Sequence, residues 1–177
     1  MNLMDIAQVL GNFGEFVGAI AVVATLIYLA LQIRQHSAEI RLNSHQASTE
    51  RWAGLIGSVL QDSAKFEMFR DGLDSYSSLS PERQAQFHSH LYNLLTAYTN
   101  NLQLFQGGVI LEETHQLQKR DFARVLKCPG TKEWREALVL EPDIRAQLDG
   151  LLEDVIADSE AIPLTQLLPF LQKQDNP

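Results

Sequence analysis

The 177-residue chain contains a single cysteine, Cys128, and no lysine or arginine before Arg34. One thiol cannot form an intramolecular disulfide, which agrees with a reducing compartment. The net charge is −8, with 22 acidic against 14 basic residues, and the basic residues form no cluster. A surface that follows nucleic-acid phosphates needs such a cluster, so we expect no nucleic-acid partner.

Motifs of the common enzyme classes are also missing. The chain has no Gly-rich phosphate loop, no nucleophile elbow and no zinc-protease helix motif. Its histidines lack ligand spacing: His88 and His90 would lie about 200° apart around a helix and could not share a metal ion. Cys128 precedes a proline and has no histidine beside it, so we interpret it as a structural or exposed thiol. We therefore predict a protein that is not an enzyme and has no metal and no cofactor.

Strand-type alternation of apolar and polar residues, internal repeats and low-complexity segments are absent as well, which indicates an all-α protein. Ser80-Pro81-Glu82 is a helix start signal, and Gly107-Gly108 is a stop signal with a left-handed cap. The predicted helices after residue 61 cover 64–73, Pro81 to about Gly107, 112–126, a short segment opened by Thr131, and a segment that begins at Pro142. Cys128-Pro129-Gly130 is expected to be a turn.

The spacing of apolar residues also predicts which side chains enter the core. Trp52, Trp134, Leu117 and Ile144 lie on apolar helix faces, so we expect them to be buried. His88 borders such a face, and we expect it to be partly buried and hydrogen-bonded.

One long apolar run stands out near the N-terminus. Residues 16–31, FVGAIAVVATLIYLAL, carry no charge, and with Ile33 the run reaches 18 positions. As a helix it measures about 27 Å, close to the ~30 Å hydrocarbon core of a membrane. A cleaved signal peptide would need a basic start and a small-residue cleavage site, and neither is present. The buried central helix of a soluble bundle remains an alternative to the predicted transmembrane helix at 15–34.

The charged residues on either side predict the orientation of this span. Asp5 and Glu15 precede it, whereas Arg34, Arg41 and Arg51 follow within about 20 residues, the window in which basic residues set topology. We therefore expect a short N-terminus outside the cell and a cytoplasmic C-terminal domain.

The domain organisation follows from these segments. Residues 1–14 are a short N-terminal segment, and 35–61 continue the span as a helical stalk. The stalk is either continuous or broken near Asn43-Ser44, whose side chains compete for backbone hydrogen bonds. Residues 62–160 form a helical bundle domain, and 161–177 form an apolar tail interrupted by prolines.

Small residues recur at three- and four-residue steps along the span. Gly14 and Gly18 form the G-x-x-x-G pattern at which membrane helices approach closely. We predict that this face contacts a second helix, from another copy of the chain or from a membrane-protein partner, while lipid surrounds the rest. The predicted contact residues are Gly11, Gly14, Gly18, Ala21, Thr25 and Gln32, the last as a donor to a neighbouring helix.

The segment Gly14–Val23, GEFVGAIAVV, continues at Leu26–Gln35 as LIYLALQIRQ. It resembles the start of a group of uncharacterised small bacterial proteins with a membrane-anchored helical domain. These open with such a helix and end it in a Gln-Ile-Arg-Gln-like boundary, although His36-Ser37 departs from the Asn-Thr expected next. Later positions that also fit are Trp52, Gly72 and Leu79–Glu82. The resemblance implies a bacterial inner-membrane location and no known activity.

These observations predict a non-enzymatic, single-pass membrane protein that self-associates or serves as a subunit or scaffold of a membrane complex. Two alternatives remain. Copies of the span could enclose a channel, although Thr25 and Gln32 would be its only polar lining. The domain could also be an enzyme that acts on a membrane-borne substrate, because a site built from scattered residues needs no motif.

Overall fold

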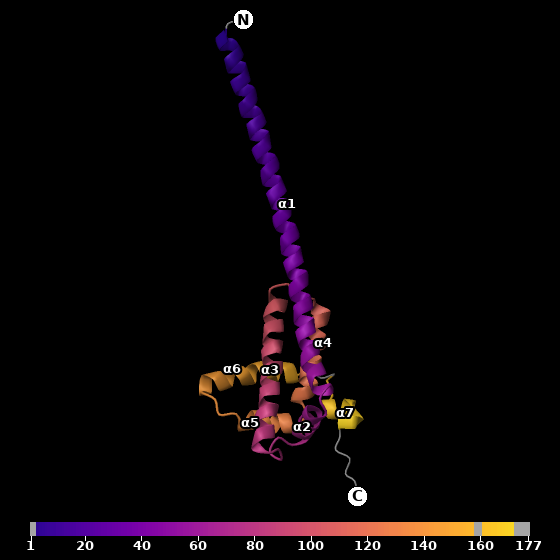
Figure 1. Cartoon of the computed structure of the whole chain (residues 1–177). Coiled ribbons are helices and arrows are strands. Elements are labelled where there is room, and N and C mark those ends of the chain that lie inside the picture. The colour runs from indigo at the N-terminus through magenta and orange to yellow at the C-terminus, as the bar shows by residue number, and fades with distance from the viewer. Residues whose placement is uncertain (1–2, 158–160, 172–177) are drawn as a thin grey trace. The chain divides into compact units, whose positions relative to one another are not determined.

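The computed structural model describes residues 3–157 and 161–171, and these residues form helices and no strand (Figure 1). The all-α prediction is therefore confirmed. The chain divides into two compact units, Met1–Ser44 and His45–Pro177. The helices are α1 Leu3–Leu60, α2 Ser63–Asp74, α3 Pro81–Gln106, α4 Glu112–Leu126, α5 Pro129–Ala137, α6 Pro142–Ile156 and α7 Leu164–Leu167, followed by the 3-10 helix η1 Pro169–Leu171.

The first unit consists of the N-terminal part of α1. Its large apolar side chains between Phe13 and Ile33 are 45–66% exposed and point to every side of the helix. Such a helix has no polar face to offer to water. Its most apolar 18-residue window has a mean hydropathy of 2.3 and no buried residue. Among the residues that the structure describes, one helix, near the N-terminus, is therefore long and apolar enough to span a membrane.

Helix α1 is continuous through Asn43 and Ser44, so the stalk contains no break there. The helix propensities of Asn and Ser are at most ~0.7 kcal/mol per residue below that of alanine. That difference is too small to interrupt a helix with good helix formers on both sides. Gly11 and Gly14 likewise lie inside α1, although glycine costs a helix interior about 1 kcal/mol.

Local signals mark the start of α2 and both ends of α3 in the second unit. Asp62 caps α2, because its carboxylate accepts from the backbone N–H groups of Ala64 and Lys65 at 3.0 and 3.1 Å. Ser80 caps α3 in the same way, with Pro81 at the first helical position. Gly108, just after α3, has a φ of +68°, the left-handed conformation that glycine adopts most readily. Both the start and the stop signal of α3 are confirmed.

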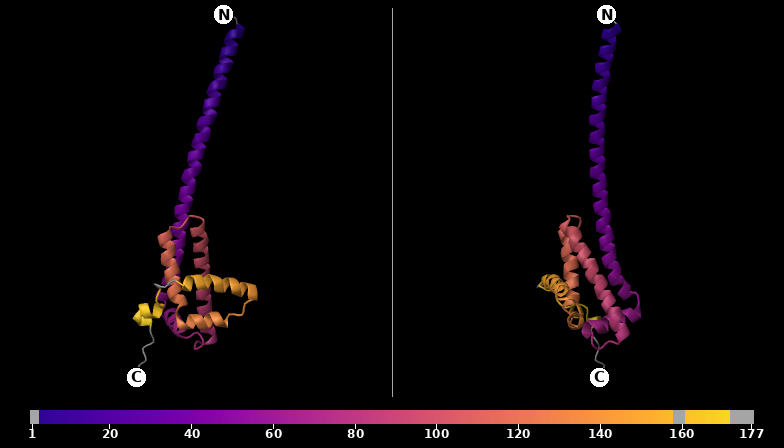
Figure 2. Two further views of the ribbon diagram at one scale, coloured as in Figure 1. Left: turned by 180° about the vertical axis from the view of Figure 1, so that it is seen from behind. Right: turned by 90° about the vertical axis from the view of Figure 1, so that its left-hand side faces the viewer.

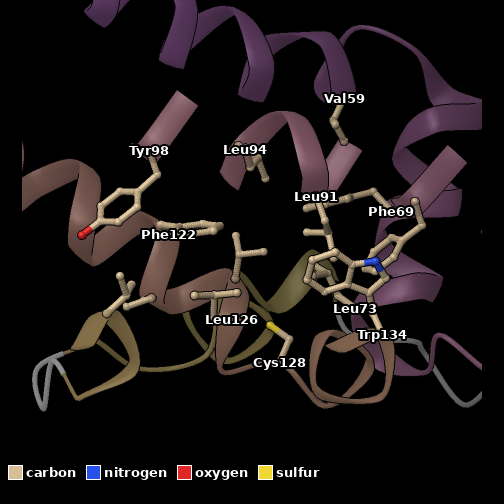
Figure 3. Packing of buried hydrophobic residues seen from close by; sticks show 14 of the residues in the cluster. Val59, Phe69, Leu73, Leu91, Leu94, Tyr98, Phe122, Leu126, Cys128 and Trp134 are labelled. Atoms are coloured by element: carbon tan, nitrogen blue, oxygen red, sulfur yellow. The ribbon is translucent and has the colours of Figure 1, made fainter. Parts of the chain in front are cut away.

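A single apolar core joins the helices of the second unit. Neighbouring helices α3 and α4 run side by side, and α6 crosses them (Figure 2). Figure 3 shows Leu73, Tyr98 and Phe122 in this core, each at most 2% exposed. Trp52 and Trp134 are buried at 6% and 2% exposure, as predicted.

Several predictions of the core and its turns are wrong. The expected turn at Cys128-Pro129-Gly130 is the start of α5: Cys128 is the N-cap, and Pro129 and Gly130 are the first two helical residues, because proline fits the first helical position. Leu117 and Ile144 are 63% and 49% exposed, since their helices bury other faces. His88 is exposed rather than partly buried, although its Nδ1 does accept a hydrogen bond from Trp134 Nε1 at 3.1 Å.

Candidate functional site

The small residues predicted to form a helix–helix contact share one side of α1. At about 100° per residue they fall within an arc of about 80°. The row comprises Gly11, Gly14, Gly18, Ala21 and Thr25, all exposed, and Gln32 continues it. A Cβ added to any of the three glycines would meet no atom within 4 Å. The structure therefore aligns the predicted residues on one open face, and the packing of a second helix against them stays a prediction.

The two polar members of this face have partners within α1. Thr25 Oγ1 donates to the carbonyl oxygen of Ala21 at 2.8 Å, and Gln32 Nε2 donates to the Tyr28 hydroxyl at 2.8 Å. A polar group satisfied inside its own helix enters hydrocarbon at lower cost. Gln32 keeps its carbonyl oxygen and a second N–H for a neighbouring helix.

The opposite face of α1 is bulky. Phe16, Ile20, Val23 and Ile27 line a shallow apolar groove there and are each more than half exposed. Large side chains on this face hold a neighbouring backbone away, whereas the glycine face lets it approach. The two faces of one helix therefore differ in the type of contact that they permit.

The second unit contains an apolar cavity of about 280 Å³ that the sequence analysis did not predict. Its walls come from the last turns of α1 and from α2, α3, α4, α7 and η1. The apolar lining residues are Trp52, Ile56, Val59, Leu60, Phe66, Phe69, Leu94, Phe122, Val125, Leu164, Leu167, Leu168, Phe170 and Leu171. The only signal in the sequence was the spacing of Trp52, Ile56 and Val59, which is equally typical of an ordinary core face.

Few polar residues line this cavity, and two of its lining residues each carry a buried N–H group without a hydrogen-bond partner. Trp52 Nε1 and Arg124 Nε are buried and make no hydrogen bond. Arg124 Nη1 donates to Asp121 Oδ1 at 2.8 Å, so the guanidinium charge is balanced. Burial, and then the charge of Lys65, lower the pKa of His90. The polar side chains of the lining therefore include His90 and one balanced ion pair, whereas the two N–H groups are buried within the wall.

A buried polar layer joins the end of α1 to α3 and α4. Ser48 Oγ donates to Asn101 Oδ1, and Asn101 Nδ2 donates to Gln118 Oε1. His115 stacks on Phe105 with a ring separation of 4.3 Å, and burial lowers its pKa. Ser48, Asn101 and Gln118 hydrogen-bond to one another inside the fold, so we interpret the layer as structural.

Two candidates for chemistry are a cysteine nucleophile and a metal-ligand cluster, and the described residues offer little geometric support for either. Cys128 is buried, its Sγ lies 3.3 Å from the carbonyl oxygen of Arg124, and burial raises its pKa. A raised pKa keeps the thiol protonated and a poor nucleophile. Within residues 3–157 and 161–171, no group of three or more His, Cys, Asp or Glu lies close enough to hold a metal ion.

Comparison of the chain with known protein families, curated proteins and solved structures gave no match. The resemblance of residues 14–35 to bacterial membrane-anchored proteins therefore stays a prediction.

Proposed function

We propose that this protein is a single-pass membrane protein that associates, with its own copies or with another membrane protein, through the small-residue face of α1. The observation that carries this proposal is the open row of Gly11, Gly14 and Gly18 on a fully exposed apolar helix. In hydrocarbon, helices gain from close backbone packing rather than from burial of apolar surface. Membrane lipid would surround the bulky face, and the helical domain would act as a subunit or scaffold.

The proposed location is a bacterial inner membrane, with the N-terminus outside and the helical domain in the cytoplasm. All 14 lysines and arginines lie on the C-terminal side of the span, which supports this orientation. The resemblance of residues 14–35 supports the bacterial membrane.

A channel formed by copies of α1 has less support. Its only polar lining would be Thr25 and Gln32, and both already make hydrogen bonds within their own helix. Conducting pores commonly present rings of polar or charged groups to the ion. No specific observation favours an enzyme that acts on a membrane-borne substrate.

The molar mass of the purified chain, measured by light scattering in a mild detergent with the detergent contribution subtracted, tests the proposal. We expect a multiple of the 19.9 kDa chain mass, or a stoichiometric complex with a co-purifying membrane protein. A strict monomer with no co-purifying protein would contradict it.

A further inference from the structure

Residues 161–171, which we call the C-terminal strap, form the shortest helices of the second unit. Pro163 precedes α7, which has four residues, and Pro169 begins η1, which has three. The backbone N–H groups of residues 166, 167, 168 and 171 donate to carbonyl oxygens within the strap itself. Helical segments this short are not stable alone in water. The strap therefore depends on its side-chain contacts with the helices that precede it.

Those side-chain contacts enclose a void. Ala161 and Leu171 are each 3% exposed, so both ends of the strap are buried against the second unit. Side chains between them border the apolar cavity of about 280 Å³, as Leu171 also does. A side chain beside a void lacks neighbouring atoms on that side, so it gains less from dispersion attraction than one in a filled core. The strap residues that line the cavity are Leu164, Leu167, Leu168, Phe170 and Leu171.

The strap also lies against the single thiol of the chain, Cys128, which is labelled in Figure 3. Cys128 has no exposed surface, and its Sγ lies 4.0 Å from Thr165 Oγ1 in the strap. Next to it, Lys127 Nζ donates to the carbonyl oxygen of Ala161 at 2.7 Å. Movement of the strap away from the second unit would break these contacts and uncover the thiol on this side. Reaction of Cys128 can therefore report on the position of the strap.

We propose that the C-terminal strap is a gate, which opens locally while the preceding helices of the second unit stay folded. Opening admits solvent to the apolar cavity and to Cys128, and closing seals both. Segments with few well-packed contacts open at a lower free energy than the whole domain, and the strap is such a segment. Because the strap belongs to the second unit, this gate is independent of any association through α1.

The rate at which Cys128 reacts with a maleimide tests the proposal on the full-length protein in mild detergent. Local opening exposes little surface, so the rate should change little with urea at concentrations below the unfolding transition. Circular dichroism of the same samples locates that transition. A rate that rises steeply with urea, in parallel with global unfolding, would overturn the gate. So would a thiol that does not react at all before unfolding, or one that reacts as fast as in the unfolded chain.

Substitutions separate opening of the strap from unfolding of the domain. Leu171→Ala removes a buried contact that only the closed strap makes, so the labelling rate should rise about tenfold or more. Leu117→Ala is the matched control, because Leu117 is 63% exposed, and its labelling rate should equal that of the wild type. An unchanged rate in Leu171→Ala would contradict the proposal.

A second substitution destabilises the domain away from the strap. Leu91 on α3 is 1% exposed and does not line the cavity. Leu91→Val should lower the urea midpoint of the domain by removing a buried methylene group, yet leave the labelling rate at its wild-type value. If the rate rose in proportion to the loss of global stability, Cys128 would react through unfolding of the whole domain, and the gate would be overturned.

Discussion

Gly130 packs directly on the backbone of Gly72, so that a Cβ added to Gly130 would collide with the Gly72 carbonyl oxygen. A Cβ on Gly72 would in turn meet the ring of Phe87, 2.4 Å from its Cδ2. The first turn of α5 therefore rests on α2 at the closest distance that a backbone permits. Neither glycine has a positive φ, so glycine is required at these positions because a side chain would not fit, and not because of the backbone conformation.

Gly130→Ala should lower the free energy of unfolding by about 1–3 kcal/mol, the usual cost of overpacking a core. Urea unfolding of the purified protein, followed by its helical circular dichroism, measures this change. Gly150→Ala on α6 is the matched control, because a Cβ there meets no atom within 4 Å. It should raise helix stability by up to ~1 kcal/mol. Equal effects of the two substitutions would contradict the close packing of Gly130.

The buried polar layer should respond to loss of its central residue. Asn101→Leu removes the partner of both Ser48 and Gln118, and it should cost about 1–3 kcal/mol of unfolding free energy for the buried polar groups left unpaired. Asn93→Leu, at an exposed position of the same helix, should change stability by no more than ~0.5 kcal/mol. The same urea titration compares them, and a neutral Asn101→Leu would show that the layer contributes nothing.

Local signals predicted helix ends better than they predicted buried faces. The caps at Ser80 and Gly108 depend on neighbouring residues only, and both were predicted correctly. Gln118 is buried because its partner is Asn101, 17 residues earlier in the chain, whereas Leu117 is exposed despite its hydrophobicity. Apolar spacing cannot detect a polar pair formed by two helices. The small residues of α1 could be aligned from sequence because they share one helix, whereas the cavity depends on how residues 164–171 pack against Trp52 and Phe122.

Stability should also depend on the protonation of His115. Burial lowers its pKa below the ordinary 6.5, with Lys119 acting in the same direction and Glu112 and Asp154 opposing. The unfolded chain then binds a proton more readily than the folded one. The contribution of His115 to the free energy of unfolding is therefore complete above about pH 6.5 and is lost as the pH drops below that value. Burial lowers the pKa of His90 as well, which adds to this loss. His115→Phe should reduce the difference in stability between about pH 7.5 and about pH 5.5, and an unchanged difference would exclude His115 as its source.

The orientation of the span can be tested separately from its association. In a Cys128→Ser background, Asn2→Cys should react with a membrane-impermeant maleimide added to intact cells with a permeabilised outer membrane, because the N-terminus is expected outside. Val139→Cys is the control: this residue is 99% exposed between α5 and α6, and its thiol should react only after lysis. The reverse labelling pattern would indicate the opposite orientation, with the N-terminus in the cytoplasm. Release of the chain from the membrane by carbonate would argue against a membrane span altogether.

The small-residue face predicts which substitution in the span disrupts assembly. If Gly14, Gly18 and Ala21 contact a second helix, a larger side chain at the middle position must push the two backbones apart. Gly18→Leu should therefore cost about 1–3 kcal/mol per contact, the range for overpacking, and should dissociate a marginal oligomer. Membrane insertion should persist, because leucine is more favourable than glycine in hydrocarbon.

Ile20→Leu on the bulky face keeps the side-chain volume and is the matched control for Gly18→Leu. Light scattering in the same detergent should give a lower molar mass for Gly18→Leu and the wild-type mass for Ile20→Leu. Carbonate extraction should leave both variants in the membrane fraction, which separates lost association from lost insertion. Equal masses for Gly18→Leu and wild type would show that the glycines face lipid, and any assembly would then depend on the helices of the second unit.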